Sequence, residues 1–243
     1  GRLKCGISER LIEMKKAIFV RGGRPAHQPV ETTEHFRGFL EAQGYEISVS
    51  DSPAIYADAE FMASVDLIIQ CIESEIDEAS VQGLTQAVEN GTGFIGWHGG
   101  VLVGFTQSEA YYQLIGAKFV AHPGKPAGER TGNESDFFIQ HKIEFTNLGK
   151  EDEITRGFSD IELETEQYWL LADSYMKVLA TTTQSAHPND PWKTPVTSPA
   201  IWSRQWGKGR IFICSPGHNL KVVSHPSITR IIQNGAIWAT RNS

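Results

Sequence analysis

The first half of the chain alternates between short apolar runs and longer amphipathic stretches. The apolar runs predict strands at residues 17–20, 46–49, 67–72 and 93–96. The amphipathic stretches predict helices at residues 30–40 and 78–89, which end at Gly44 and at Asn90-Gly91. Strands that alternate with helices are typical of βαβ units and of a parallel sheet. Because the apolar runs are continuous rather than alternating, we expect helices on both faces of that sheet.

The second half departs from this rhythm and predicts antiparallel strands. Extended structure is expected at residues 136–145, 178–182, 200–206 and 210–214. The last two of these segments form a predicted hairpin around Gly207-Lys208-Gly209. A Pro-rich surface loop is expected at residues 190–197, and an amphipathic helix at residues 227–240. Together the patterns predict one α/β domain over residues 14–243, with a mainly parallel sheet and an antiparallel extension, preceded by an N-terminal extension over residues 1–13.

Composition narrows the class of protein. Hydrophobic residues make up 40% of the 243 residues, which is enough for a sizeable core. The 22 Lys and Arg against 29 Asp and Glu give a net charge of -7, which argues against a nucleic-acid partner, since that binding depends on cations. No apolar stretch approaches the roughly 20 residues that cross a bilayer, so no membrane association is expected. Three widely spaced cysteines, Cys5, Cys71 and Cys214, predict reduced thiols in a cytoplasmic protein.

A glycine pattern in the middle of the chain does not predict a nucleotide site. Residues 91–96 match the pattern GxGxxG, but they follow a predicted helix and run into a strand. The phosphate-binding version follows a strand and opens a helix. We therefore expect no nucleotide cofactor.

The turn Trp97-His98-Gly99-Gly100 follows the fourth predicted strand and is the strongest candidate for a functional site. Small residues let the backbone turn sharply and lift one side chain above the carboxyl end of the sheet, where open α/β sheets bind ligands. His98 stands where an elbow-type enzyme has a Ser or Cys nucleophile. An imidazole there is suited to be a general base, a metal ligand or a hydrogen-bond donor. The alternative is a structural histidine that caps the turn.

Other polar and aromatic residues repeat this placement or could join the site. His27 and His218 follow two of the predicted strands, and His122 follows a further strand-like run at residues 118–120, although each alone is as readily structural as functional. An acidic-aromatic segment at residues 164–169 lies in the irregular middle region and offers a carboxylate partner for an imidazole, or simply a solvated edge. The tryptophans are suited to stack on sugar rings, but most tryptophans fill cores.

Taken in order, these segments resemble the trehalose-utilisation (ThuA-like) family. The matching segments are residues 66–69, 93–99, 112–123, 154–158, 166–168, 199–210, 216–218 and the terminal helix with Trp238-Ala239. The resemblance implies a class I glutamine amidotransferase-like fold, which is a flavodoxin-like parallel sheet with helices on both faces. Amidotransferases of that fold carry Cys at the elbow, so His98 disfavours Cys-dependent glutamine hydrolysis. The family often has a His-Pro pair where this chain has His141-Lys142, which weakens a role for His141.

The family is linked to the breakdown of trehalose and related disaccharides. The resemblance therefore implies an enzyme, a hydrolase or lyase, that acts on a disaccharide or its 3-keto derivative. His98 is the expected base, His218 its counterpart, and Glu166 the group that orients or exchanges protons. The expected substrate-binding residues are Trp97, Gly99, His122, Tyr168, Trp202 and Arg204.

Two alternatives to this acid–base enzyme stay open. A divalent Zn or Mn ion held by His98, His218 and a carboxylate is an alternative basis for catalysis. A non-catalytic sugar-binding or regulatory module is the alternative to an enzyme. The expected partner is a small sugar, and a homo-oligomer is left open.

Overall fold

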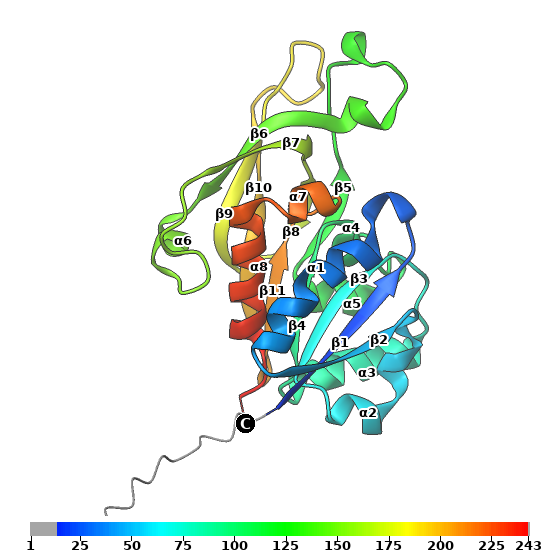
Figure 1. Ribbon diagram of the computed structural model, residues 1–243. Helices are drawn as coiled ribbons and strands as arrows, with labels where there is room; N and C mark the ends of the chain where they lie inside the picture. The colour runs from blue at the N-terminus through cyan, green and yellow to red at the C-terminus, as the bar shows by residue number, and fades with distance from the viewer. Residues whose placement is uncertain (1–13, 243) are drawn as a thin grey trace, which may run out of the picture.

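Five parallel strands form the core of a nine-stranded sheet in this computed structural model, which describes residues 14–242 (Figure 1). In spatial order they are β2 (Tyr45–Ser50), β1 (Lys15–Gly22), β3 (Leu67–Ile72), β4 (Gly93–Trp97) and β11 (Gly209–Cys214). The first four lie on the segments predicted to form a parallel sheet, so that prediction is confirmed; β11 was expected only as an arm of an antiparallel hairpin, and it also pairs in parallel with β4. The N-terminal extension expected at residues 1–13 lies outside the described residues, as does Cys5.

Helices cover both faces of this core, which explains the continuous apolar strands. On one face lie α1 (Pro29–Ala42) and α8 (Pro226–Ala239), and on the other α2 (Ala59–Ala63), α3 (Glu78–Glu89) and α5 (Glu109–Ile115) (Figure 1). Successive residues of β3 point to opposite faces, so Ile69 packs into the cluster that contains Phe36 of α1, and Ile68 into the cluster that contains Leu84 of α3. Every residue of β3 is buried. Because both faces of the sheet are covered, apolar side chains are needed at odd-numbered and even-numbered positions of the strand alike.

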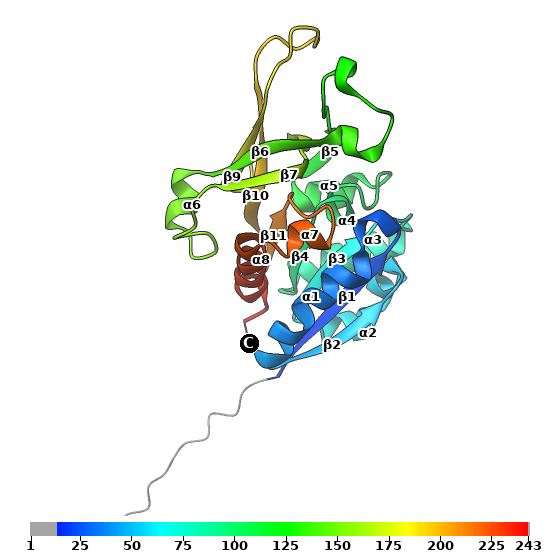
Figure 2. The same cartoon turned by 45° about the horizontal axis from the view of Figure 1, so that its top comes forward.

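The remaining strands extend the sheet in antiparallel fashion beyond β11. They are β10 (Val196–Trp206), β9 (Lys177–Gln184), β6 (Phe138–Phe145) and β7 (Ile161–Glu166), in that order. The predicted hairpin is confirmed, with Gly207 and Lys208 in the turn and Gly209 already paired with Trp206. Strand β10 begins at Val196, so the last residues of the expected loop belong to the sheet because they pair with β9. Figure 2 shows β6 and β7 crossing above the end of the parallel strands.

Two further features of the middle region differ from the prediction. Residues 161–166, placed partly in an irregular segment, form β7, and β5 (Ala117–Ala121) pairs with β8 (Trp169–Ala172) as a separate two-stranded sheet. Short helices complete the described chain: η1 (Pro25–His27), η2 (Pro53–Ala57), α4 (Gly99–Leu102), η3 (Ala127–Glu129), η4 (Glu134–Phe137), α6 (Asn147–Glu151) and α7 (Leu220–Val223).

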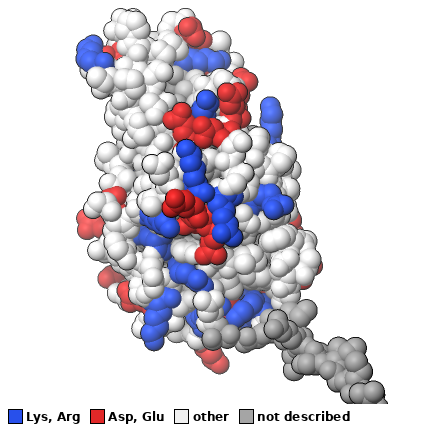
Figure 3. Space-filling view, turned by 90° about the vertical axis from the view of Figure 1, so that its left-hand side faces the viewer, with Lys and Arg blue, Asp and Glu red and all other residues white. Residues whose placement is uncertain are grey.

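The surface and the helices add two observations about partners. On the face shown in Figure 3, Lys and Arg are interspersed with Asp and Glu and do not form one basic field. Within residues 14–242, each helix is too short or too polar to cross a bilayer.

Candidate functional site

His98 occupies a strained turn between β4 and α4. Its backbone has φ 49° and ψ -143°, a combination that costs a side chain-bearing residue on the order of 1–3 kcal/mol. Its N–H donates to the carbonyl of Cys214 at 3.0 Å, which ties the turn to the end of β11. A Cβ on Gly100 would lie 2.7 Å from the Cα of Cys71, so the chain passes β3 too closely for any other residue. The predicted elbow is therefore present in the backbone, with an imidazole at its apex.

Four side chains from four separate segments meet at this turn. His27 comes from η1, His98 from the turn after β4, Glu166 from the end of β7 and His218 from the loop after β11. One donor atom of each lies within 4.8 Å of the others. His98 Nε2 is 3.1 Å from Glu166 Oε2 and 3.2 Å from His218 Nδ1, and the latter two atoms are 3.5 Å apart. We call this group the histidine cluster.

The ring nitrogens that face away from the cluster contact acceptors. His98 Nδ1 lies 3.2 Å from the carbonyl of Ser215, which only accepts, so Nδ1 carries the proton and Nε2 keeps its lone pair. His218 Nε2 lies 2.9 Å from Glu134 Oε1, and His27 Nδ1 lies 3.0 Å from Glu73 Oε1, although the latter contact lacks hydrogen-bond alignment. The acceptors behind His98 and His218 fix which nitrogen of each of these two rings is turned to the centre.

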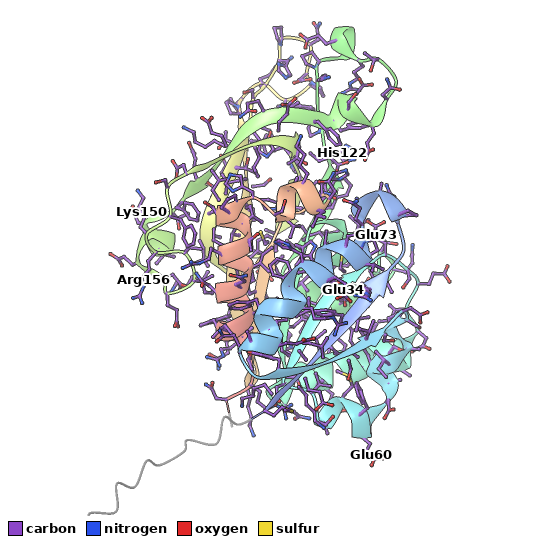
Figure 4. The ribbon with its side chains drawn as sticks, viewed as in Figure 1. Glu34, Glu60, Glu73, His122, Lys150 and Arg156 are labelled. Atoms are coloured by element: carbon purple, nitrogen blue, oxygen red, sulfur yellow. The ribbon has the colours of Figure 1, made fainter. Side chains whose placement is uncertain are left out.

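Two acidic residues that hold the cluster were not predicted. Glu73 follows β3 directly and also pairs with Arg24 at 3.2 Å, and Glu134 belongs to η4. Figure 4 shows Glu73 and His122 toward the same end of the sheet, opposite Glu60. His27 was noted from the sequence but was not among the expected site residues. A carboxylate immediately after an apolar strand was a signal for Glu73, whereas nothing local marks Glu134.

The pKa values of the two histidines that contact Glu166 are shifted in opposite directions. Burial lowers the pKa of His98 to about 4, and Glu166 offsets this only in part. Burial also lowers the pKa of His218, but hydrogen bonding and attraction from Glu166 and Glu134 outweigh it, so the net pKa is raised. Burial raises the pKa of Glu166, yet hydrogen bonds with His218 and His98 hold that pKa well below its ordinary value. These shifts favour an anionic Glu166 and a neutral His98, and they make His218 the more readily protonated of the two rings.

Tyr168 and His122 form an aromatic wall beside the cluster. The Tyr168 ring stacks on His98 with centroids 4.3 Å apart, and its hydroxyl donates to His98 Nε2 at 2.8 Å. Burial first, and the neighbouring Glu166 and Glu73 next, raise the pKa of Tyr168 well above its ordinary value, so it stays a donor. His122 stacks against Tyr168 at 6.4 Å and packs on Phe137 at 4.2 Å.

The other predicted substrate-binding residues lie elsewhere, with one exception. Gly99 lies at the site, because a Cβ there would meet His27 Cε1 at 2.6 Å. Trp97 is buried against Phe36, and Trp202 is buried and donates to the carbonyl of Ile115 at 3.0 Å. Arg204 pairs with Asp173 at 2.9 Å, and it lies opposite Ile211, three residues along β11 from Cys214. That offset is about 10 Å along a strand, so the structure does not bring Arg204 to the cluster.

The cluster lies just beneath the surface. Side-chain exposures are 9% for His27, 3% for His98, 8% for Glu166 and 3% for His218, whereas Glu134 above His218 is 55% exposed. A cavity of about 540 Å³ opens in the antiparallel extension, lined among others by Phe138, His141 and Gln167. Phe138 also contacts the His218 ring, with centroids 5.1 Å apart, whereas none of the four cluster residues lines the cavity.

The arrangement supports two kinds of chemistry. An anionic carboxylate between two imidazoles whose pKa values are shifted in opposite directions is suited to move protons. Three imidazoles and a carboxylate that converge on one point are also suited to hold a first-row divalent metal ion, so the residues that could ligate one are His27, His98, Glu166 and His218.

Comparison with known proteins gives a family match and a set of similar folds. The ThuA family model, described as trehalose utilisation, matches residues 16–239. The fold is similar to a putative ThuA-like protein from Bacteroides uniformis, with TM-score 0.69, 17% identity and coverage of 93% of this chain and 90% of that one. No curated protein sequence matches this chain significantly.

Two further solved structures share the fold at lower similarity. A protein described as cytoplasmic from Salmonella typhimurium has TM-score 0.57 and 14% identity, covering 94% of this chain and 100% of that one. A β-galactosidase from Bacillus circulans has TM-score 0.55 and 10% identity, covering 93% of this chain but 30% of that one.

Proposed function

Because the chain belongs to the trehalose-utilisation (ThuA-like) family, we propose that it is an enzyme of carbohydrate utilisation that acts on a disaccharide or its 3-keto derivative. The observation that supports this most is the contact of His98 Nε2 with Glu166, His218 and Tyr168 at the carboxyl end of the parallel strands. Pairs of titratable groups whose environments drive their pKa values apart are typical of acid–base sites. A cytoplasmic location belongs to the same proposal.

The proposed reaction starts at the carbon next to the ketone of a 3-keto sugar. The C3 carbonyl acidifies the C2 hydrogen, and His98 Nε2 removes that proton because its Nδ1 proton is held by Ser215. The electron pair left on C2 forms a C1–C2 double bond as the C1–O glycosidic bond breaks. The departing oxygen takes a proton from His218. The 3.2 Å between His98 Nε2 and His218 Nδ1 then lets the proton return, with Glu166 stabilising either charged ring.

The experiment is turnover of purified protein with trehalose and with 3-keto-trehalose, followed by release of the second sugar. We expect the keto sugar to be cleaved, and His98→Ala to lower kcat by about a hundred- to ten-thousand-fold, the usual contribution of a general base. His35→Ala is the matched control, since His35 lies exposed on α1 and contacts Thr229. Undiminished turnover by the His98→Ala variant would contradict the assigned role.

A non-catalytic sugar-binding or regulatory module is the second candidate. It is favoured by the β-galactosidase match, in which this fold corresponds to under a third of a larger chain. Saturable sugar binding by calorimetry, without turnover of either sugar, would select this module over the enzyme.

A further inference from the structure

We infer that the histidine cluster binds one first-row divalent transition-metal ion through His27, His98, His218 and Glu166. This inference rests on the proposed function for its role in catalysis but not for the binding itself. Its basis is the orientation of the donor atoms, their spacing and the groups behind them.

The orientation of the rings leaves electron pairs facing one another. The Ser215 carbonyl holds the proton of His98 on Nδ1, so His98 Nε2 presents a lone pair to the cluster. Glu134 contacts His218 Nε2 in the same manner and leaves His218 Nδ1 facing inward. Those two inward nitrogens are 3.2 Å apart and share Glu166 Oε2 as a neighbour. With both rings neutral, the inward lone pairs and the carboxylate repel one another; a proton on His218 Nδ1 relieves this repulsion, and a divalent cation could take the place of that proton.

The spacing of the donors matches a metal coordination polyhedron. Zn–N bonds of about 2.0–2.1 Å imply ligand–ligand distances of about 3.3–3.4 Å in a tetrahedral site, and of about 3.0 Å in an octahedral one. The observed distances among His98 Nε2, His218 Nδ1 and Glu166 Oε2 are 3.1, 3.2 and 3.5 Å. These three atoms therefore already have the dimensions of one face of such a site.

His27 supplies the fourth donor. Its Nδ1 lies 3.0 Å from Glu73, which leaves Nε2 as the nitrogen available to an ion, and its ring centroid is 4.9 Å from that of His98 and 5.1 Å from that of His218. The three rings thus surround a common point.

The groups behind the ligands complete the pattern of a metal site. Metal-bound histidines usually contact a carboxylate or a backbone carbonyl through the other ring nitrogen, which orients the ring and raises its basicity. Here Glu73, Glu134 and the Ser215 carbonyl stand behind His27, His218 and His98 respectively. A set of three imidazoles and one carboxylate suits Zn²⁺ or Mn²⁺ and is too rich in nitrogen for Mg²⁺ or Ca²⁺. When bound, the ion would polarise the carbonyl of a keto sugar as a Lewis acid, and His98 and His218 would then act as its ligands in place of their roles as base and acid.

The test begins with untagged protein stripped by a chelator and then titrated with Zn²⁺, Mn²⁺ or Co²⁺. We expect one ion per chain by calorimetry and elemental analysis, a visible ligand-field spectrum with Co²⁺, and a rise in Tm on addition of the ion. His27→Ala and Glu166→Gln should each weaken binding by at least tenfold and reduce the Tm rise. Glu73→Gln should weaken it by about ten- to a hundredfold, as for other groups that orient a ligand. The His35→Ala control should bind as the unaltered chain does.

Circular dichroism of each variant shows whether it is folded, so a loss of binding can be assigned to the site. Less than one ion per chain, or unchanged affinity in both His27→Ala and Glu166→Gln, would overturn the metal site. Turnover by the stripped protein equal to that of the loaded protein would overturn the catalytic role of the ion while leaving the proposed function intact. Conversely, one tightly bound ion without sugar turnover would support the metal site and contradict the proposed function.

Discussion

Gln70 is a buried polar residue whose replacement should loosen the turn that carries His98. It lies on β3, is fully buried, and accepts a hydrogen bond from the Tyr56 hydroxyl at 2.8 Å. Its amide nitrogen donates to the carbonyl of Gly100 at 3.1 Å and to the Tyr111 hydroxyl at 2.9 Å. Since Gly100 lies in α4, two residues after His98, this network connects β3 to the helix that directly follows His98.

Gln70→Met keeps the shape of the side chain but removes all three hydrogen bonds. The Tyr111 hydroxyl keeps its bond to the Val101 carbonyl, whereas the Tyr56 hydroxyl and the Gly100 carbonyl lose their partner within residues 14–242. Each unpaired buried group costs about 1–3 kcal/mol, so the free energy of unfolding should fall by about 2–6 kcal/mol. That is a large part of the 5–15 kcal/mol typical of a folded domain.

Equilibrium urea denaturation followed by circular dichroism measures this loss, and Tyr56→Phe provides the control. In the Tyr56→Phe background no hydroxyl is left unpaired, so Gln70→Met should cost about 1–3 kcal/mol less. A cost below about 1 kcal/mol, or an equal cost in the two backgrounds, would show that the buried network does not stabilise the fold in this way.

Two further predictions concern ionisable groups outside the cluster. Hydrogen bonds from Arg37 and then Arg21 lower the pKa of Glu34 from 4.5 to about 2. Because the folded pKa lies below the unfolded one, this stabilisation is complete above about pH 4.5 and is lost as the pH falls toward 2. In urea denaturation, Glu34→Gln should therefore lower stability at neutral pH, and this loss should shrink below pH 4.5. A loss that does not depend on pH would refute the prediction. Burial raises the pKa of the Cys71 thiol to about 12, so at pH 8 about one thiol in ten thousand is ionised. Peptide mapping after iodoacetamide treatment should find Cys71 unmodified in native protein and modified in urea, and rapid native labelling would contradict the burial.

Local signals were sufficient for the parallel half of the fold. The predicted helix at residues 78–89 has those bounds in the structure, because Asp77 caps its first turn through the N–H of Ser80 and Asn90 ends it. Strand β7 was missed although Ile161, Leu163 and Thr165 alternate with exposed residues. Its outward positions are acidic, which lowers the apolar signal that a strand usually gives.

The site could be predicted only in part, because its contacts join distant segments. His98 was identified because glycine-rich turns at strand ends have a local signature, and His218 because it follows a strand in the same position. Their contacts with His27, Glu73 and Glu134 depend on how the strands are ordered and on where η4 lies, which no local pattern specifies. Trp202 and Arg204 illustrate the converse, since a buried tryptophan and a buried arginine with an ion-pair partner look the same in sequence as residues that bind a sugar.

The separation of the cluster residues along the chain has a consequence for folding in the cell. His27 and His98 belong to the first half of the chain, whereas Glu166 is supplied by the antiparallel extension and His218 by the segment after the last strand. A nascent chain that has finished its first four strands therefore holds two of the four groups, and the set is complete only when β11 has entered the sheet between β4 and β10. Any property that needs all four residues is therefore expected only once both the antiparallel extension and the end of the chain have folded onto the parallel strands.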